Sequence, residues 1–337
     1  MRIALLLLAL VFWPTAGRSA PVDCNVPSYD GRYCRLEFEG WSVELNAALI
    51  KDNPSLARTT LDVLRAQLKD IVGRVPAVRV AELRRVVIWI EPKSPGEEQQ
   101  LVHHPTGSTW PENNGYPPAQ RGSIKIRNAQ YYVNRLQGVY AQVLHEFAHA
   151  YHEIVLGFDD RSIANAFENA IQTGLHRSVA YKGGGSKRSY ALTNHKEYFA
   201  ELSEAYFGSN DYFPFNRADL QSYDPIGFAA VRAAWEDTVP IAVRETKGIN
   251  HACESPVASL LSDRRTRLAI RNGRDEPIKL TWIDFKGERR DNWTIAPGAL
   301  STQQTWVGHN FLIVDTSERC LATATASGPV SWIDVLP

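Results

Sequence analysis

The chain has 337 residues with 37 basic and 37 acidic side chains, so its formal net charge at pH 7 is zero. Nucleic-acid-binding proteins usually carry an excess of positive charge, which this chain lacks, so we expect no nucleic-acid partner. The length suffices for two domains, and beyond residue 20 no apolar run is long enough to span a membrane.

Residues 1–20 are typical of a signal peptide. Arg2 precedes an apolar run from Ile3 to Trp13, and small residues then lead to Ala20. A charged start, a short apolar run and a small-residue cleavage region are the parts of an export signal, and the run is too short for a transmembrane helix. We expect a soluble chain that is secreted and extracellular, or periplasmic in a bacterium.

The even number of cysteines, four, agrees with an oxidising compartment. Cys24 and Cys34 are close in sequence, while Cys253 and Cys320 bracket much of the final segment. Among the possible pairings we therefore expect Cys24 with Cys34 and Cys253 with Cys320. No Cys-x-x-Cys spacing occurs, which argues against a cysteine-based metal site.

The amino-terminal part predicts a mixture of helix and strand. Apolar residues recur at helical spacing over 56–72, and the run 85–90 predicts a buried strand. Residues 123–128 alternate between apolar and polar side chains, as a half-exposed strand does. We expect this last strand to be a sheet edge that can pair with an extended peptide substrate.

Residues 95–121, between these strands, predict a long loop because Pro, Gly and Asn recur there. His103 and His104 fall within this segment. We expect both to be exposed loop side chains.

The segment His145-Glu146-Phe147-Ala148-His149 carries the strongest chemical signal in the sequence. It lies in a run of apolar residues at helical spacing that ends at Gly157. Residues four apart share one face of a helix, so both imidazoles can bind one cation while Glu146 reaches a water on it. The alternative is a pair of core histidines, each needing its own polar partner. His152 is rotated off this face, and we expect it to support the site or to lie at the surface; the alternative is that it is a metal ligand.

A catalytic zinc needs a third protein ligand. A metzincin would have a histidine at position 155, where this chain has Val155, so that class is excluded. Residues 193–207 predict a helix with Glu197, Glu201 and Glu204 on one stripe. Like charges at this spacing repel by about 0.2–0.5 kcal/mol on an isolated helix, and a divalent cation would reverse the sign. We expect Glu197 to be the ligand; the alternatives are a capping role for Glu197 and ligation by Glu201.

At these residues the sequence resembles the gluzincin metallopeptidases and, within them, the anthrax lethal factor-like peptidases. That family combines HExxH on one helix with a later Tyr-x-x-Thr-Asn-x-x-Glu-Phe-Phe-Ala-Glu segment. Residues 190–201 match this segment, with Tyr198 in place of the first Phe. The resemblance implies a zincin-like fold and the following roles: zinc ligands His145, His149 and Glu197, general base Glu146, oxyanion-facing Tyr190 and a supporting carboxylate Glu201.

The chemistry expected of these residues is peptide-bond hydrolysis with one zinc ion per chain. Zinc polarises the scissile carbonyl and acidifies a water, while Glu146 takes the proton and later gives it to the leaving amine. A donor such as Tyr190 would stabilise the charge on the carbonyl oxygen. His195 is an alternative donor, although we expect a solvated side chain there. The alternative function is a secreted peptide-binding protein with a structural or inactive zincin lobe, and the presence of Glu146 favours the enzyme.

The composition changes near residues 245–262. Helical segments such as 228–236 precede this point, and strand-like runs separated by Gly-containing turns follow it. The clearest runs are 267–271, 278–285, 311–315 and 321–325. We therefore expect an α+β chain, with a zincin-like metallopeptidase domain over 21–250 and a small antiparallel β-sandwich over 255–337.

The last region resembles the β domain of the von Hippel-Lindau tumour suppressor family, through residues 280–287, 294–298 and 305–311. In that family the corresponding surface binds a hydroxyproline-containing peptide. The resemblance implies a domain that assists substrate binding, with a proline- or hydroxyproline-containing partner at Thr305, His309 and Phe311. Asn292 and Phe311 depart from the family pattern, which has Tyr and Trp there. For His309 the alternative is a partly buried sheet residue with a hydrogen bond.

Overall fold

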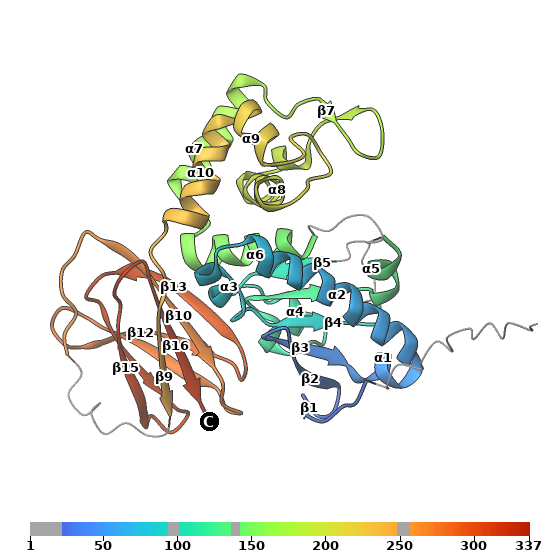
Figure 1. Cartoon of the computed structure of the whole chain (residues 1–337). Helices are drawn as coiled ribbons and strands as arrows, with labels where there is room; N and C mark the ends of the chain where they lie inside the picture. The colour runs from blue at the N-terminus through green and yellow to red at the C-terminus, as the bar shows by residue number, and fades with distance from the viewer. Residues whose placement is uncertain (1–21, 94–100, 136–141, 248–256) are drawn as a thin grey trace, which may run out of the picture.

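The computed structural model describes residues 22–93, 101–135, 142–247 and 257–337. The expected signal peptide lies outside these ranges, as do Cys253 and residues 136–141 just before the HExxH segment. Within them the chain is a mixed α+β protein with several sheets. Figure 1 shows three parts: a six-stranded sheet with the helices packed on it, a group of helices above, and two four-stranded sheets beside them.

The six-stranded sheet has the order β1-β2-β3-β4-β6-β5, so β5 is an edge strand. β5 (Leu101–His104) runs antiparallel to β6 (Ser123–Ile126). The strand expected near 123–128 is confirmed as β6. Its expected place at the sheet edge is wrong, because β5 pairs with its outer side. Residues 101–121 are not one loop either, since they contain β5 and two short helices. The other elements here are β1 (Pro27–Ser28), β2 (Tyr33–Phe38), β3 (Trp41–Asn46), β4 (Ile88–Ile90), α4 (Trp110–Asn113) and the 3₁₀ turn Pro118–Gln120.

Alternation along the strands decides which side chains face the helices. Ile88 and Ile90 of β4 belong to the main core, together with Ile124 and Ile126 of β6. Trp89, between the first pair, lies in a separate cluster on the other face. This period of two places one layer of apolar side chains against α2 and α6.

Helix α2 (Pro54–Arg74) confirms the helix expected over 56–72. The Asn53 side chain accepts a hydrogen bond from Leu56 N, and Pro54 occupies the first turn, where a missing N–H costs nothing. α2 buries a stripe of residues against the sheet and against α6. The neighbouring helices are α1 (Ala47–Asp52), α3 (Ala77–Leu83) and α5 (Ala129–Arg135).

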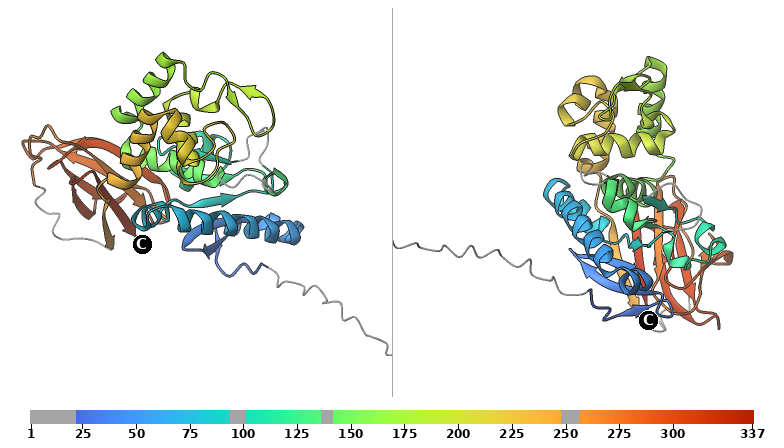
Figure 2. Two further views of the ribbon diagram at one scale, coloured as in Figure 1. Left: turned by 45° about the horizontal axis from the view of Figure 1, so that its top comes forward. Right: turned by 90° about the vertical axis from the view of Figure 1, so that its right-hand side faces the viewer.

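A second group of helices follows α6 (Gln142–Tyr151) and its continuation, a π-helical segment over His152–Leu156. In both views of Figure 2 this group lies on one side of α6 and the six-stranded sheet on the other. The helix expected over 228–236 is confirmed by α10 and the π-helical segment after it. The elements are α7 (Arg161–Thr173), β7 (Val179–Ala180), β8 (Ser186–Lys187), the 3₁₀ turn Tyr190–Leu192, α8 (His195–Phe207), α9 (Arg217–Tyr223), α10 (Pro225–Arg232) and the π-helical segment Ala233–Asp237.

The carboxy-terminal strands form two four-stranded sheets, β13-β10-β16-β9 and β12-β11-β14-β15. The second sheet is antiparallel throughout, whereas β16 pairs in parallel with both β10 and β9 in the first. The expectation of an antiparallel arrangement is therefore right for one sheet and wrong for the other. The strands are β9 (Ala242–Lys247), β10 (Arg265–Asn272), β11 (Ile278–Ile283), β12 (Arg289–Ile295), β13 (Leu300–Trp306), β14 (Asn310–Val314), β15 (Cys320–Thr325) and β16 (Val330–Leu336).

Apolar side chains from both sheets meet in one cluster, which includes Leu268, Leu280, Ile313 and Ile333. β9 lies at the edge of the first sheet through its pairing with β16. The expected boundary at residue 250 assigned β9 to the amino-terminal domain, but its hydrogen bonds place it with the carboxy-terminal strands.

Polar and apolar contacts join the carboxy-terminal sheets to the rest of the chain. Arg85 pairs with Asp334 of β16 at 2.7 Å, and Trp332 from the same strand belongs to the main core. The hydroxyls of Thr106 and Thr302 are 2.7 Å apart, which joins the segment after β5 to β13. The contact between Thr106 and Thr302 thus links the segment next to the edge strand β5 to the carboxy-terminal sheets.

Cys24 and Cys34 form a disulfide with their Cα atoms 5.3 Å apart, which confirms that expected pairing. The partner expected for Cys320, Cys253, lies outside the described residues. None of the helices in the described part of the chain has the length and apolar character of a bilayer span.

Candidate metal centre

Helix α6 presents His145 and His149 on one face, one turn apart. Both side chains are largely buried, with 11% and 12% of their surface exposed. The helix runs on through the π-helical segment and ends at Gly157, whose φ of 91° is unfavourable for other residues. The predicted helix and its stop are confirmed over the described residues.

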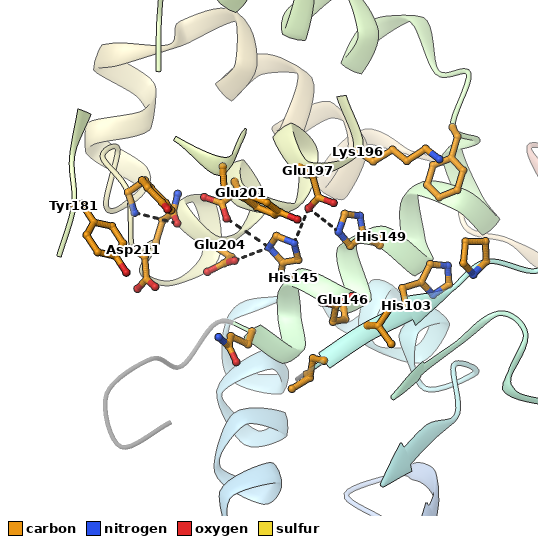
Figure 3. Close-up of a pocket in the computed structure, with 18 of the residues that line it drawn as sticks. His103, His145, Glu146, His149, Tyr181, Lys196, Glu197, Glu201, Glu204 and Asp211 are labelled. Atoms are coloured by element: carbon orange, nitrogen blue, oxygen red, sulfur yellow. Dashed lines mark hydrogen bonds and ion pairs between the residues drawn. The ribbon is translucent and has the colours of Figure 1, made fainter. Parts of the chain in front are cut away.

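Helix α8 brings Glu197 to these imidazoles. The Asn194 side chain caps the helix by accepting hydrogen bonds from the backbone N–H groups of Lys196 and Glu197. The Glu197 carboxylate itself extends to the two histidines (Figure 3). The helix expected over 193–207 is confirmed, and capping leaves the Glu197 side chain available for another role.

Three potential ligand atoms converge on one point. Glu197 Oε2 is 3.1 Å from His145 Nε2 and 3.1 Å from His149 Nε2. Two ligands of a tetrahedral zinc, each about 2.1 Å from the ion, are separated by about 3.4 Å. The spacing and the nitrogen and oxygen donor set therefore fit a zinc ion held by His145, His149 and Glu197.

A carboxylate outside this triad orients His145. Glu204 Oε1 lies 2.7 Å from His145 Nδ1, whereas the nearest oxygen of Glu201 is 3.9 Å away. The resemblance had assigned the supporting role to Glu201, but the geometry gives the closer contact to Glu204. Carboxylates on the far nitrogen of a ligating histidine fix its orientation and increase its basicity.

These contacts control protonation around the site. Burial lowers the pKa of His145, but hydrogen bonds to Glu197 and Glu204 outweigh it and hold that pKa well above the usual range. Burial and the nearby charge of His145 lower the pKa of His149, despite its bond to Glu197. Burial and the adjacent Glu204 raise the pKa of Glu201 to about 8. A bound cation would take the place of protons on these nitrogens.

The site opens into a cavity of about 650 Å³ between α6, α8 and β5. Glu146 and Tyr190, the two expected catalytic side chains, both line it. Tyr190 is 39% exposed, and its ring centroid lies 6.4 Å from that of His145. Burial and the charge of Glu197 raise the pKa of Tyr190, so its hydroxyl stays a proton donor at neutral pH. Both side chains can therefore reach a substrate held in this cavity.

Four histidines outside the triad lie in environments that the sequence did not predict in full. His103 and His104 are buried in β5 and are not exposed loop side chains. His152 is fully buried between Phe158 and Phe199, and neither ring nitrogen has a hydrogen-bond partner among the described residues. His195 Nε2 contacts the Phe158 carbonyl at 2.7 Å, so His195 is not merely solvated.

His103 belongs to a buried network that holds β5 in place. Its Nε2 lies 2.7 Å from Glu153 Oε2, and the backbone N–H and hydroxyl of Thr106 both donate to Glu153 Oε1. Burial alone would raise the pKa of Glu153, but these hydrogen bonds outweigh it and lower that pKa below its usual value. The network joins the π-helical segment after α6 to the edge strand of the sheet.

We expect Glu153→Gln to lower the free energy of unfolding at pH 7 by about 2 kcal/mol, because a buried charged partner is lost. The pKa of Glu153 is lower in the folded protein than its unfolded-state value of 4.5, so ionised Glu153 stabilises the fold at pH values above 4.5. This stabilisation is lost as the pH falls through the lower pKa of the folded state. The difference between wild type and variant should therefore shrink below pH 4.5. Urea denaturation at both pH values measures this, with the exposed Glu168→Gln as control; a difference that grows in acid would contradict the assignment.

Two of the three residues expected to bind a peptide in the β region contact each other. Thr305 Oγ1 and His309 Nδ1 are 3.0 Å apart, and both side chains are buried. The His309 ring packs against Trp282, Phe285 and Trp306. Phe311 is buried in the cluster between the sheets. The hydrogen-bonded sheet histidine expected as the alternative thus describes the observed environment of His309.

Comparison of the chain with protein-family models and with curated protein sequences finds no match. Functional interpretation therefore depends on the residues and their geometry. Glu204 and Asp211, which also line the cavity, are two site residues to which the sequence patterns assign no role. Only the position of Glu204 on the stripe of Glu197 pointed towards the site.

Proposed function

We propose that the protein is an exported zinc-dependent endopeptidase of the gluzincin type. The observation that carries this proposal is the convergence of His145, His149 and Glu197, with Glu146 beside them in an open cavity. A site of this kind provides three protein ligands and leaves space for water and substrate. A purely structural zinc site would have no use for the carboxylate of Glu146.

The arrangement of the chain supports the same proposal. A six-stranded sheet with α2 and α6 against it, followed by α8 with the third ligand, is the order that the resemblance to the lethal factor-like peptidases implies. The two carboxy-terminal sheets, which share one apolar cluster, support a β-sandwich domain that begins with β9. We assign residues 22–241 to the zincin-like domain on this basis.

Each site residue has a separate role in the proposed reaction. A zinc ion bound here would polarise the scissile carbonyl and acidify the attacking water. Glu146 accepts a proton from that water and passes it to the leaving amine. Tyr190 donates a hydrogen bond to the carbonyl oxygen as negative charge develops on it. Glu204 holds His145 in the orientation that directs Nε2 to the site.

The substrate is bound as an extended strand along β5. As the edge of the six-stranded sheet, β5 has backbone groups available for pairing, and Leu101, Val102 and His103 line the cavity. The role expected for residues 123–128 thus passes to β5. The network around Glu153 keeps this strand at a fixed distance from α6.

The carboxy-terminal sheets favour a second candidate function, peptide binding without hydrolysis. The aromatic side chains around His309 are suited to proline-containing segments, which dock on aromatic surfaces. In the leading proposal this surface recruits protein substrates to the peptidase. In the alternative it is the main binding site and the zincin lobe is inactive.

Digestion of casein and of collagen-like peptides by the purified full chain tests the proposal. We expect cleavage that stops when a chelator removes the metal and returns on addition of one equivalent of zinc. Cleavage that a chelator does not affect would exclude a metallopeptidase. An absence of cleavage by the zinc-loaded protein, together with retained peptide binding, would favour the alternative.

A further inference from the structure

The cavity around the metal centre is lined by more acidic than basic side chains. Its lining includes the carboxyl groups of Glu146, Glu197, Glu201, Glu204 and Asp211, whereas Lys196 is the single Lys or Arg among the described residues that line it. Glu146, Glu197 and Glu204 already have roles at the metal centre. The other two, Glu201 and Asp211, have no role in the proposed reaction.

Glu201 is a buried carboxyl group with one long ion pair among the described residues, 3.9 Å between its Oε1 and His145 Nδ1. Its side chain is 6% exposed, and Oε2 makes no hydrogen bond with any described residue, although Asn210 is close by. Figure 3 shows Glu201 and Asp211 in the same part of the cavity, on the side of His145 away from His149. A buried oxygen without a partner is costly, which points to a ligand that supplies the missing donor.

Asp211 extends this acidic region towards solvent. It is only partly buried, and no described residue forms an ion pair or side-chain hydrogen bond with its carboxylate. Two nearby lysines are engaged elsewhere: Lys187 lies over the Tyr181 ring at 4.1 Å, and Lys182 donates to the Ser209 hydroxyl. The charge on Asp211 is therefore available to a ligand.

Charge is unequally distributed between the two ends of the cavity. Lys196 lies at the opposite end in Figure 3, with its ammonium group 3.8 Å from the centre of the Phe158 ring. At the acidic end, Tyr181 and Tyr212 form an aromatic wall with their ring centroids 4.9 Å apart. An aromatic wall beside carboxylates suits a long aliphatic stem that ends in a cation.

We propose that the acidic end formed by Glu201 and Asp211 binds a lysine or arginine side chain of the substrate close to the scissile bond. The stem of that side chain lies along Tyr181 and Tyr212, and its cationic head reaches the two carboxylates. Lys196 repels a basic side chain at the other end, so the preference has a direction along the bound peptide. This inference depends on the proposed peptidase function for its meaning, but binding can be tested without hydrolysis.

The test measures binding to the full chain carrying Glu146→Gln, so that peptides are not consumed. Short acetylated and amidated host peptides carry lysine, arginine, norleucine or glutamate at one central position. Calorimetry should give about tenfold tighter binding for the lysine and arginine peptides than for the norleucine peptide, as expected for one charged contact in a partly buried site. Asp211→Asn in the same background should reduce this ratio to about twofold or less, and Asp211→Lys should favour the glutamate peptide.

The exposed Asp275→Asn serves as the matched control, and its ratio should stay that of the parent. Equal binding of the lysine and norleucine peptides would overturn the inference, as would a lysine preference that Asp211→Lys leaves intact. Binding of a second equivalent of zinc or calcium that abolishes the lysine preference would show instead that the acidic end is a metal site. A cleavage assay of the wild-type protein with the same peptides separates the peptidase proposal from the proposal of a basic side-chain site. If the wild type cleaves none of the peptides but the lysine preference in binding remains, only the peptidase function is contradicted.

Discussion

Glu146→Gln is expected to lower kcat for peptide hydrolysis by about 10³-fold or more while the protein still binds one zinc ion. Glutamine keeps the shape of the side chain but cannot accept a proton, and a positioned general base contributes about 10² to 10⁴ in rate. The metal should remain because Glu146 is outside the group of converging ligand atoms formed by His145, His149 and Glu197. Steady-state kinetics on a cleaved peptide and metal analysis of the same sample measure both quantities.

Glu168→Gln is the matched control for this variant. Glu168 is an exposed glutamate on α7 outside the cavity, so the same chemical change there should leave kcat and zinc content unchanged. Retention of wild-type kcat by Glu146→Gln would exclude Glu146 as the base. Loss of zinc from Glu146→Gln would instead show that it holds the metal.

Glu197→Ala is expected to weaken zinc binding by more than about a hundredfold and to abolish hydrolysis as a consequence. Even groups that only support a ligand cost about 10- to 100-fold in metal affinity when removed, and a direct ligand should cost more. The fold should survive, because the α8 cap depends on the Asn194 side chain and on the backbone N–H at position 197. Competition with a chromophoric chelator gives the affinity, and circular dichroism checks the fold.

A graded comparison separates ligation from support. Glu204→Gln changes only the partner of His145 Nδ1, so its zinc affinity should fall between those of wild type and Glu197→Ala. Glu168→Gln again provides the control. If Glu197→Ala keeps wild-type affinity while Glu201→Gln loses zinc, the ligand is Glu201, which was the alternative that the sequence left open.

The sequence predicted the core of the candidate site because local patterns determine it. The histidine spacing on α6 follows from helical periodicity alone. The stripe on α8 placed Glu197 and Glu204 on one face, but their division of roles depends on how α6 and α8 pack. Packing between helices far apart in the sequence is not encoded by either helix, so only the structure shows that Glu204 lies closer than Glu201 to His145 Nδ1, at 2.7 Å against 3.9 Å.

Tertiary contacts also explain what the sequence patterns missed. β5 is a short segment with His103 and His104 in it, and neither its length nor its composition distinguishes it from a loop. Pairing with β6 and the contact with Glu153 stabilise it as a strand. In the same way β13, with Thr302 and two neighbouring glutamines, is too polar to predict from hydrophobicity and is defined by its pairing with β10.

The pairing of β9 with the carboxy-terminal strands could not be predicted, for a topological reason. β9 has few apolar residues, and its partner β16 follows some ninety residues later, beyond all the other strands of the region. β16 does alternate in its sequence, with Trp332 buried in the main core, so its presence could have been predicted. Its parallel pairing with β9 and β10 could not be predicted, because no local turn links β16 to either of these strands.

Diffraction from crystals of the zinc-loaded protein, measured on both sides of the zinc absorption edge, shows whether His145, His149 and Glu197 hold a zinc ion. We predict one anomalous peak bonded to His145 Nε2, His149 Nε2 and the Glu197 carboxylate, with a water as the remaining ligand near Glu146. A site without zinc under saturating metal would contradict the account, and so would a zinc ion whose coordination is completed by a fourth protein side chain that leaves no position for water.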